Sequence, residues 1–268
     1  MSRRFYPSGL DTFEDIEGYR PGGFHPVHLG DTLGESYKIL HKLGSDGLST
    51  TWLARDTVGN RYQALKILKA EETAASTELR TLEKLATIQS DDRGKPHIRF
   101  PKAHFIIQGP NGQHICLVTD VSGPSLSGLY NVIGHGYAAG SRRLRTDLAR
   151  TAMRQVVEAV HFLHSQQICH GVDDWTEDEV LQRLGTTSTE KLVAAPGENI
   201  GDSAPRYVVE PAGMPNAKYL THDVLLVDFG EAFPFGRPPG PENIGIPVMY
   251  RAPETIFESK VKKCLYWS

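Results

Sequence analysis

The sequence is poor in cysteine and in long apolar runs. Its three cysteines are widely spaced and form no CxxC pair, which excludes a dense disulfide framework and a cysteine-rich zinc site. No apolar run approaches the roughly 20 residues that a membrane-spanning helix needs, so we expect no membrane association. No apolar signal core follows the basic N-terminus, so the expected location is the cytoplasm or the nucleus.

An excess of charge of either sign is also missing. The 29 basic and 32 acidic residues give a formal net charge of -3. No global basic field therefore attracts nucleic acid, and we expect no direct nucleic-acid binding. With 39% hydrophobic and 23% charged residues in 268 positions, the composition is that of a globular protein with one large domain or two lobes.

The first 35 residues are rich in glycine, proline and acidic residues, and their periodicity is weak. We expect an extended lead-in. Residues 19–31 carry aromatic side chains that need burial, which favours a packed segment within the lead-in. A disordered tail is the alternative.

Alternating apolar and polar residues predict a β-sheet in the first half of the chain. On the first of its strands, Lys38 and Lys42 are expected on the solvent side. A segment starting at Asp120 follows the last strand and crosses to the rest of the chain. The expected strands are residues 37–43, 49–55, 61–69, 105–108 and 114–119.

A turn from Gly44 to Gly47 joins the first two strands. Two strands around such a turn can place backbone N–H groups over phosphates, and a plain hairpin turn is the alternative. Asp46 stands within the turn, and its carboxylate would repel a triphosphate in a low-dielectric cleft. Gly47 would compensate by shifting the turn one residue.

Lys66 lies inside the apolar strand that runs from Ala64 to Leu68. A lysine there needs an anionic partner if its side chain points inward. Glu78, in the first turn of a helix predicted over residues 76–87, is the natural partner. The alternative is that both side chains face solvent.

Helical spacing of apolar residues also predicts helices over residues 146–166 and 176–184. Residues 186–222 are rich in proline, glycine, serine and threonine and have little periodicity. We expect an irregular insert there.

A short apolar run, Val224–Val227, ends in Asp228, Phe229 and Gly230. Its length and its β-branched residues predict a buried strand. A carboxylate at the end of a strand, facing a cleft, suits a hard cation such as Mg²⁺.

The order of these features is the signature set of protein kinases: a glycine-bearing hairpin, a strand lysine, a helix glutamate, Asp-Phe-Gly and then Ala-Pro-Glu at residues 252–254. The sequence resembles the SR-protein kinases, serine/threonine kinases that phosphorylate Arg-Ser-rich splicing factors. The likeness covers roughly residues 19–170 and 220–258. It is carried by residues 22–31, 42–53 and 114–121.

The resemblance implies an α+β, two-lobed protein-kinase-like fold. The N-lobe would be a β-sheet with one helix, and the mainly helical C-lobe would be incomplete. The expected divisions are an extended lead-in at 1–35, the N-lobe at 36–121, a partial C-lobe at 122–258 with an irregular insert at about 174–222, and a tail unlike the family at 259–268.

The resemblance also implies ATP and Mg²⁺ between the lobes and Arg/Ser-rich splicing proteins as partners. It assigns Asp228 to the metal. The residues that it assigns to the nucleotide are Leu43, Gly44, Gly47, Thr51, Ala64, Lys66, Glu78, Thr119, Asp120 and Val121.

The catalytic loop departs from the family's pattern, His-x-Asp-x-x-Pro-x-Asn. There the Asp accepts the substrate hydroxyl proton and the Asn holds Mg²⁺. Here Val172 stands at the position of the Asp, and no Asn lies within the next ten residues. Asp173 is the remaining candidate for the base, and Asn199 only imitates the missing Asn.

The simplest account of this loop is a deletion between Gly171 and Val172. The chain also stops 14 residues after Glu254, before the helices that complete a kinase C-lobe. Three functions stay open: an active kinase, a non-catalytic nucleotide- or protein-binding module, and a product without stable function.

Overall fold

The computed structural model describes residues 4–6, 13–74, 76–123, 146–170, 188–199, 201–212, 223–237 and 239–240. They belong to two compact units. The first draws its residues from 1–75, 101–132 and 177–220, and the second from 76–100, 133–176 and 221–268. Among the described residues, no helix is long and apolar enough to cross a membrane.

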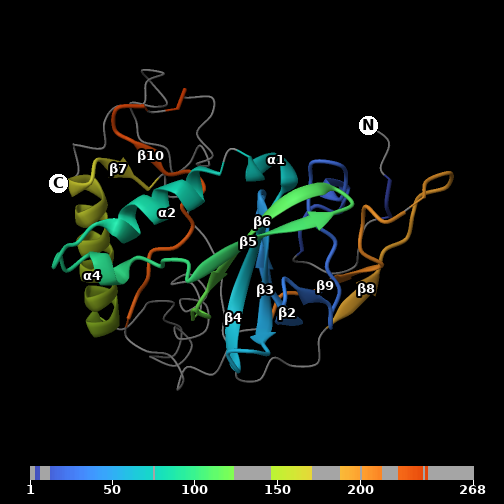
Figure 1. Ribbon diagram of the computed structural model, residues 1–268, viewed down its shortest axis with the longest axis horizontal. Coiled ribbons are helices and arrows are strands. Elements are labelled where there is room, and N and C mark those ends of the chain that lie inside the picture. The colour runs from blue at the N-terminus through green and yellow to red at the C-terminus, as the bar shows by residue number, and fades with distance from the viewer. Residues whose placement is uncertain are drawn as a thin grey trace. The chain divides into compact units, whose positions relative to one another are not determined.

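The first unit is built on a six-stranded antiparallel sheet (Figure 1) in the order β1-β2-β3-β4-β6-β5. A single helical turn, α1 (Ala70–Thr73), follows β4. The structure confirms the five predicted strands. Four of them extend one to three residues further, and the one predicted at 61–69 ends at Leu68. The strands are β1 (Thr32–Leu33), β2 (Tyr37–Ser45), β3 (Ser49–Asp56), β4 (Arg61–Leu68), β5 (Ala103–Gly109) and β6 (Gly112–Thr119).

One face of this sheet forms the larger hydrophobic core of the unit. Trp52 of β3, Leu65 and Ile67 of β4, and Val118 of β6 share one buried cluster. These positions alternate along their strands, as expected of a sheet with one packed face.

Two bulges interrupt β2. The pairing with β3 shifts between Ile39 and His41, which places Lys42 on the face of Ile39 and Trp52. The pairing shifts again between Lys42 and Gly44, so Leu43 is an extra residue between two paired positions. Leu43 packs with Leu53 and Ala64, while the Lys42 ammonium lies 5.8 Å from the centre of the Trp52 ring.

The predicted solvent position of Lys42 is wrong. Its side chain is 0% exposed and forms an ion pair with Glu14, whose side chain is 1% exposed. Glu14 also accepts a hydrogen bond from the hydroxyl of Tyr19. Simple alternation misplaced the lysine because its anionic partner comes from the lead-in, 28 residues earlier in the chain.

The lead-in packs as predicted for residues 19–31, and its aromatic residues Tyr19 and Phe24 are buried. A short 3-10 helix, η1 (Ile16–Gly18), precedes them. Leu192 and Val208, from the insert, belong to the same buried cluster.

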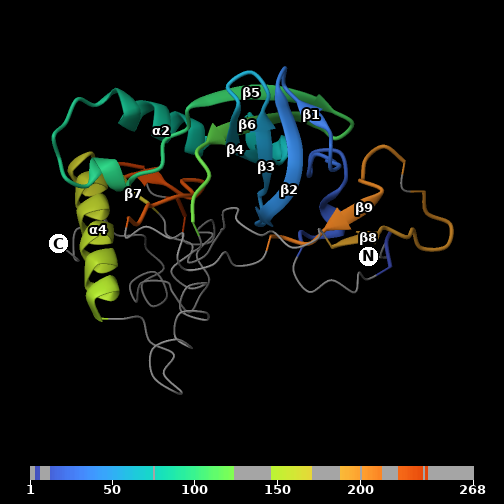
Figure 2. The ribbon, with the colours of Figure 1, turned by 90° about the horizontal axis from the view of Figure 1, so that it is seen from below.

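The insert is more regular than predicted. Strands β8 (Thr189–Lys191) and β9 (Tyr207–Val209) pair antiparallel, and both views show them beside the N-terminal segment (Figure 2). The Tyr207 hydroxyl accepts a hydrogen bond from the Leu29 N–H at 3.0 Å. The two strands gain their partners from the lead-in, which local periodicity does not reveal.

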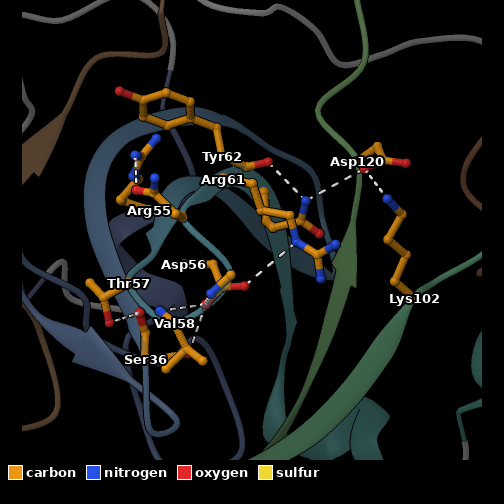
Figure 3. Close-up of polar contacts among 12 residues, drawn as sticks. Ser36, Arg55, Asp56, Thr57, Val58, Arg61, Tyr62, Lys102 and Asp120 are labelled. Atoms are coloured by element: carbon orange, nitrogen blue, oxygen red, sulfur yellow. Dashed lines mark hydrogen bonds and ion pairs between the residues drawn. The ribbon is translucent and has the colours of Figure 1, made fainter.

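Asp56 closes the hairpin between β3 and β4 (Figure 3). Its carboxylate accepts from the N–H groups of Val58 and Gly59 at 3.1 and 2.9 Å and lies 3.6 Å from the Arg61 guanidinium. The Gly59 hydrogen bond is the largest of the causes that lower the pKa of Asp56 below its ordinary value.

The described part of the second unit contains two α-helices, α2 (Thr77–Thr87) and α4 (Thr146–Ser165), which confirm two of the predicted helices. The Ser76 side chain caps α2 by accepting from the Leu79 N–H at 3.3 Å. A 3-10 turn, η2 (Lys95–His97), and the antiparallel pair β7 (Ile168–Cys169) and β10 (Phe233–Pro234) complete the described part. The helix predicted at 176–184 lies outside the described residues.

The core of the second unit joins α2, α4 and the Asp-Phe-Gly segment. Leu82 and Leu85 of α2, Phe162 and Leu163 of α4, and Phe229 share one buried cluster. The Asp-Phe-Gly segment is thus anchored by its phenylalanine.

The strand predicted at Val224–Val227 is not formed. The segment makes a single parallel bridge, between Leu226 and Ile98, and its four residues are only half-buried. Apolar, β-branched residues form a strand only where neighbouring backbone completes a ladder, and the described residues supply one bridge.

Candidate functional site

Cross-strand register aligns the predicted nucleotide-binding residues of the first unit. Thr51 pairs with both Gly44 and Lys66. In the neighbouring row, Ala64 pairs with Thr119. Paired residues share a face of the sheet, and so do residues two apart on a strand. These side chains therefore lie on the face opposite the larger core.

The same face carries the small cluster around the β2 bulge at Leu43. Leu43 and Ala64 are buried there with Ala212 of the insert, and Val121 is partly buried against them. The Ala212 N–H donates to the Lys42 carbonyl at 3.0 Å. Ala212 thus packs against part of the apolar surface that the kinase resemblance assigns to the nucleotide. No pattern in the sequence indicates this contact.

Asp120 begins the segment that leaves the sheet. Its carboxylate lies 2.5 Å from the Lys102 ammonium, and the Gln63 side-chain amide donates to it at 3.4 Å (Figure 3). The side chains of Lys102 and Asp120 are both about two-fifths exposed, at 42% and 43%. This pair fixes the end of β6, next to Thr119 and Val121.

The turn between β2 and β3 is closed by its own aspartate. The Asp46 Oδ1 atom accepts from the N–H groups of Leu48 and Ser49, both at 2.6 Å. The Oδ2 atom accepts from the Ser49 hydroxyl at 2.5 Å. Gly47 is exposed at the tip of the turn. An aspartate two and three residues before free N–H groups is a signal for such a turn, but the sequence could not show which donors it takes.

In the second unit, Glu78 ties α2 to the Asp-Phe-Gly segment. Glu78 is 5% exposed, and its Oε1 atom accepts from the Phe229 N–H at 3.3 Å. The Thr77 hydroxyl donates to the Gly230 carbonyl at 3.0 Å. The first turn of the helix therefore positions the residues that flank Asp228. The ion pair predicted between Glu78 and Lys66 would join the two units and stays a prediction.

Asp228 has an unusual backbone conformation. Its φ angle is 63°, in the left-handed region that few residues other than glycine adopt. Its Oδ1 atom accepts from the Gly230 N–H at 3.3 Å, and the residue is exposed. Such conformations cost free energy and cluster at functional sites.

Asp228 suits a metal as one ligand among several. Mg²⁺ is commonly held by one or two carboxylates together with phosphates and water. Within the described part of the chain, no group of three or more His, Cys, Asp or Glu residues could hold a metal ion.

Two predicted features lie outside the described residues: Asp173 of the catalytic loop and the Ala-Pro-Glu motif at 252–254. Asn199 is described, in an exposed turn of the first unit, where its side-chain oxygen accepts from the Gly201 N–H at 3.1 Å.

Curated relatives of the chain are protein kinases. The serine/threonine-protein kinase spk-1 of Caenorhabditis elegans is 35% identical over 156 residues, which are 57% of this chain and 15% of the relative. The chain is a relative of the SR-protein kinases. Human SRSF protein kinase 3 is 30% identical over 211 residues, which are 74% of this chain and 36% of that kinase. A serine/threonine protein kinase of Aspergillus fumigatus is 30% identical over 244 residues, 91% of this chain and 58% of the relative.

This relative of the SR-protein kinases thus spans 15% to 58% of the length of these three curated proteins. No protein-family model matches the chain. A crystal structure of a kinase domain superposes with a TM-score of 0.57 at 18% identity, covering 89% of this chain and 63% of that domain. The predicted protein-kinase-like fold is confirmed.

Proposed function

We propose that this chain binds an adenine nucleotide as protein kinases do, and that it does not transfer phosphate. The observation that carries the binding proposal is the strand register. It sets Lys66 and Ala64 on one face with Thr51 and Thr119. Leu43 packs on the same face with Ala64 and with Ala212 of the insert, so a purine ring would take the place of Ala212. An apolar surface beside a lysine fits a purine ring and an anionic tail.

The chemistry that a bound Mg²⁺ ion supplies in kinases is neutralisation of charge on the phosphates. Asp228 would hold it. The turn between β2 and β3 fits the phosphates poorly, because the Asp46 carboxylate already accepts from two backbone N–H groups. The residues for the nucleoside are therefore better suited than those for its phosphates.

The catalytic loop supports the second half of the proposal. Val172 replaces the aspartate that accepts the hydroxyl proton, and the metal-binding asparagine is missing. Removing groups that act as a unit lowers rates by several orders of magnitude. The protein partners that the kinship supports are Arg/Ser-rich splicing proteins, held without being phosphorylated.

Phosphoryl transfer to such proteins is the second candidate function. It is favoured by the left-handed conformation of Asp228, because such conformations cluster at functional sites. Asp173 would then have to act as the base.

Thermal unfolding with and without adenosine or Mg-ATP tests the binding proposal. A ligand at about 100 times its Kd stabilises the folded state by about 2.7 kcal/mol, which corresponds to a rise of roughly 5–10 °C in Tm for a chain of this size. Lys66→Met should reduce the rise with Mg-ATP, whereas Lys38→Met, at an exposed position of β2, should not. A Tm that neither ligand changes would refute the proposal.

A further inference from the structure

We propose that Asp46 is a specificity-determining residue that stands in for a phosphate, so that the chain prefers adenosine to ATP. This inference rests on the proposed adenine site and names the ligand that the site takes. It follows from the hydrogen bonds within the turn between β2 and β3, not from the sequence pattern alone.

The Asp46 carboxylate accepts hydrogen bonds from donors within its own turn. Three hydrogen bonds of 2.5–2.6 Å reach it from Leu48 and from the backbone and hydroxyl of Ser49. The Asp46 N–H donates to the Ser49 carbonyl at 3.0 Å and closes the turn. A carboxylate held by backbone N–H groups resembles the way in which such turns hold phosphate oxygens.

A nucleotide phosphate would have to displace this carboxylate or lie beside it. Displacement costs three short hydrogen bonds to a charged acceptor, which are stronger than neutral ones. A phosphate that lies beside the Asp46 carboxylate brings two negative charges close together, and they repel each other. Among the described residues, no cation pairs with Asp46, whereas Asp56 of the next hairpin has Arg61 at 3.6 Å.

The tip of the turn is open. A Cβ atom added at Gly47 would meet no atom within 4 Å beyond its chain neighbours. The obstacle is the negative charge, which neither adenine nor ribose carries. Adenosine therefore keeps its contacts with the face around Ala64 and avoids the repulsion.

Titration of the purified chain with adenosine and, separately, with Mg-ATP tests the inference. The wild type should bind adenosine at least as tightly as Mg-ATP. Asp46→Asn keeps a side-chain acceptor for the turn and removes the charge, so its affinity for Mg-ATP should rise about tenfold while its affinity for adenosine stays unchanged. Asp202→Asn, at an exposed position of the insert, is the matched control and should change neither affinity.

Two outcomes overturn the inference, and they differ. If the wild type binds Mg-ATP much more tightly than adenosine and Asp46→Asn leaves both affinities unchanged, Asp46 sets no preference, while the proposed function stands. If the folded wild type and the folded variant bind neither compound, the proposed function fails and the inference fails with it. Asp46→Gly, which removes both the charge and the acceptor, should give the same rise for Mg-ATP when its melting curve shows a folded chain.

Discussion

Replacing Lys42 by methionine should destabilise the first unit strongly. The side chains of Lys42 and Glu14 are 0% and 1% exposed and form an ion pair. Removing the ammonium leaves a buried carboxylate without its cation, which costs about 3–5 kcal/mol. The Tyr19 hydroxyl still donates to Glu14, so we expect a loss near the lower end of that range.

The partner substitution separates the charge effect from loss of packing. Glu14→Gln removes the carboxylate and keeps an acceptor for Tyr19, so Glu14→Gln combined with Lys42→Met should recover most of the stability lost in Lys42→Met. Each kcal/mol is worth roughly 2–4 °C in Tm for a chain of this size. With a loss of about 3 kcal/mol, Lys42→Met should therefore melt roughly 6–12 °C below the wild type.

Urea unfolding followed by tryptophan fluorescence measures these differences, because Trp52 lies next to Lys42. Lys38→Met, on the exposed side of β2, is the control and should stay within about 0.5 kcal/mol of the wild type. A Lys42→Met variant within about 1 kcal/mol of the wild type, or a double variant that loses the sum of the two single losses, would contradict the reasoning.

Three further predictions concern other parts of the molecule. Burial is the main cause that lowers the pKa of His25 from 6.5 to about 4. Because the unfolded chain takes up this proton at a higher pH than the folded chain, the free energy of unfolding should fall by up to about 3 kcal/mol as the pH drops from 6.5 to 4. Denaturation of His25→Gln across this range should lack that part of the pH dependence. Glu78→Ala leaves the buried Phe229 N–H without its acceptor and should cost about 1–3 kcal/mol in urea unfolding, whereas Glu78→Gln keeps an acceptor and should cost less; equal losses would contradict the role of this hydrogen bond. An arginine at position 212 cannot fit beside Leu43 in the buried cluster, so Ala212→Arg should move this part of the insert away from the ligand surface. The variant should lose about 1–3 kcal/mol of stability and bind adenosine more tightly in a titration. An unchanged affinity would show that the insert does not cover the ligand surface.

The sheet could be predicted because its signal is local. β3 and β4 alternate apolar and polar residues between turn residues, and β-branched residues such as Thr50 and Ile67 favour strands. A capping serine, Ser76, and apolar residues at helical spacing predict the helix α2.

Contacts between distant parts of the chain could not be predicted. Lys42 looked like a surface residue because the bulge at Leu40, which moves Lys42 to the face of Trp52, and the partner Glu14 are not visible in local alternation. Val224–Val227 looked like a strand because propensity says nothing about whether a neighbouring strand is present.

The candidate site also has a part that could be predicted from the sequence and a part that could not. Lys66, Ala64 and Thr51 could be assigned to a nucleotide from the kinase resemblance, and the strand register shows that they share one face of the sheet. The hydrogen bonds of Asp46 and the burial of Ala212 depend on the folded backbone. Their roles toward a ligand stay predictions until binding is measured.

The central claim is nucleotide binding without phosphoryl transfer. The most direct test incubates the chain with γ-labelled Mg-ATP, at a concentration that saturates binding, and an Arg/Ser-rich peptide, beside the Lys66→Met variant. The account predicts no label on the peptide above that found with Lys66→Met, because Val172 occupies the position of the catalytic base. Label transferred by the wild type and lost in Lys66→Met would contradict the account and establish an active kinase.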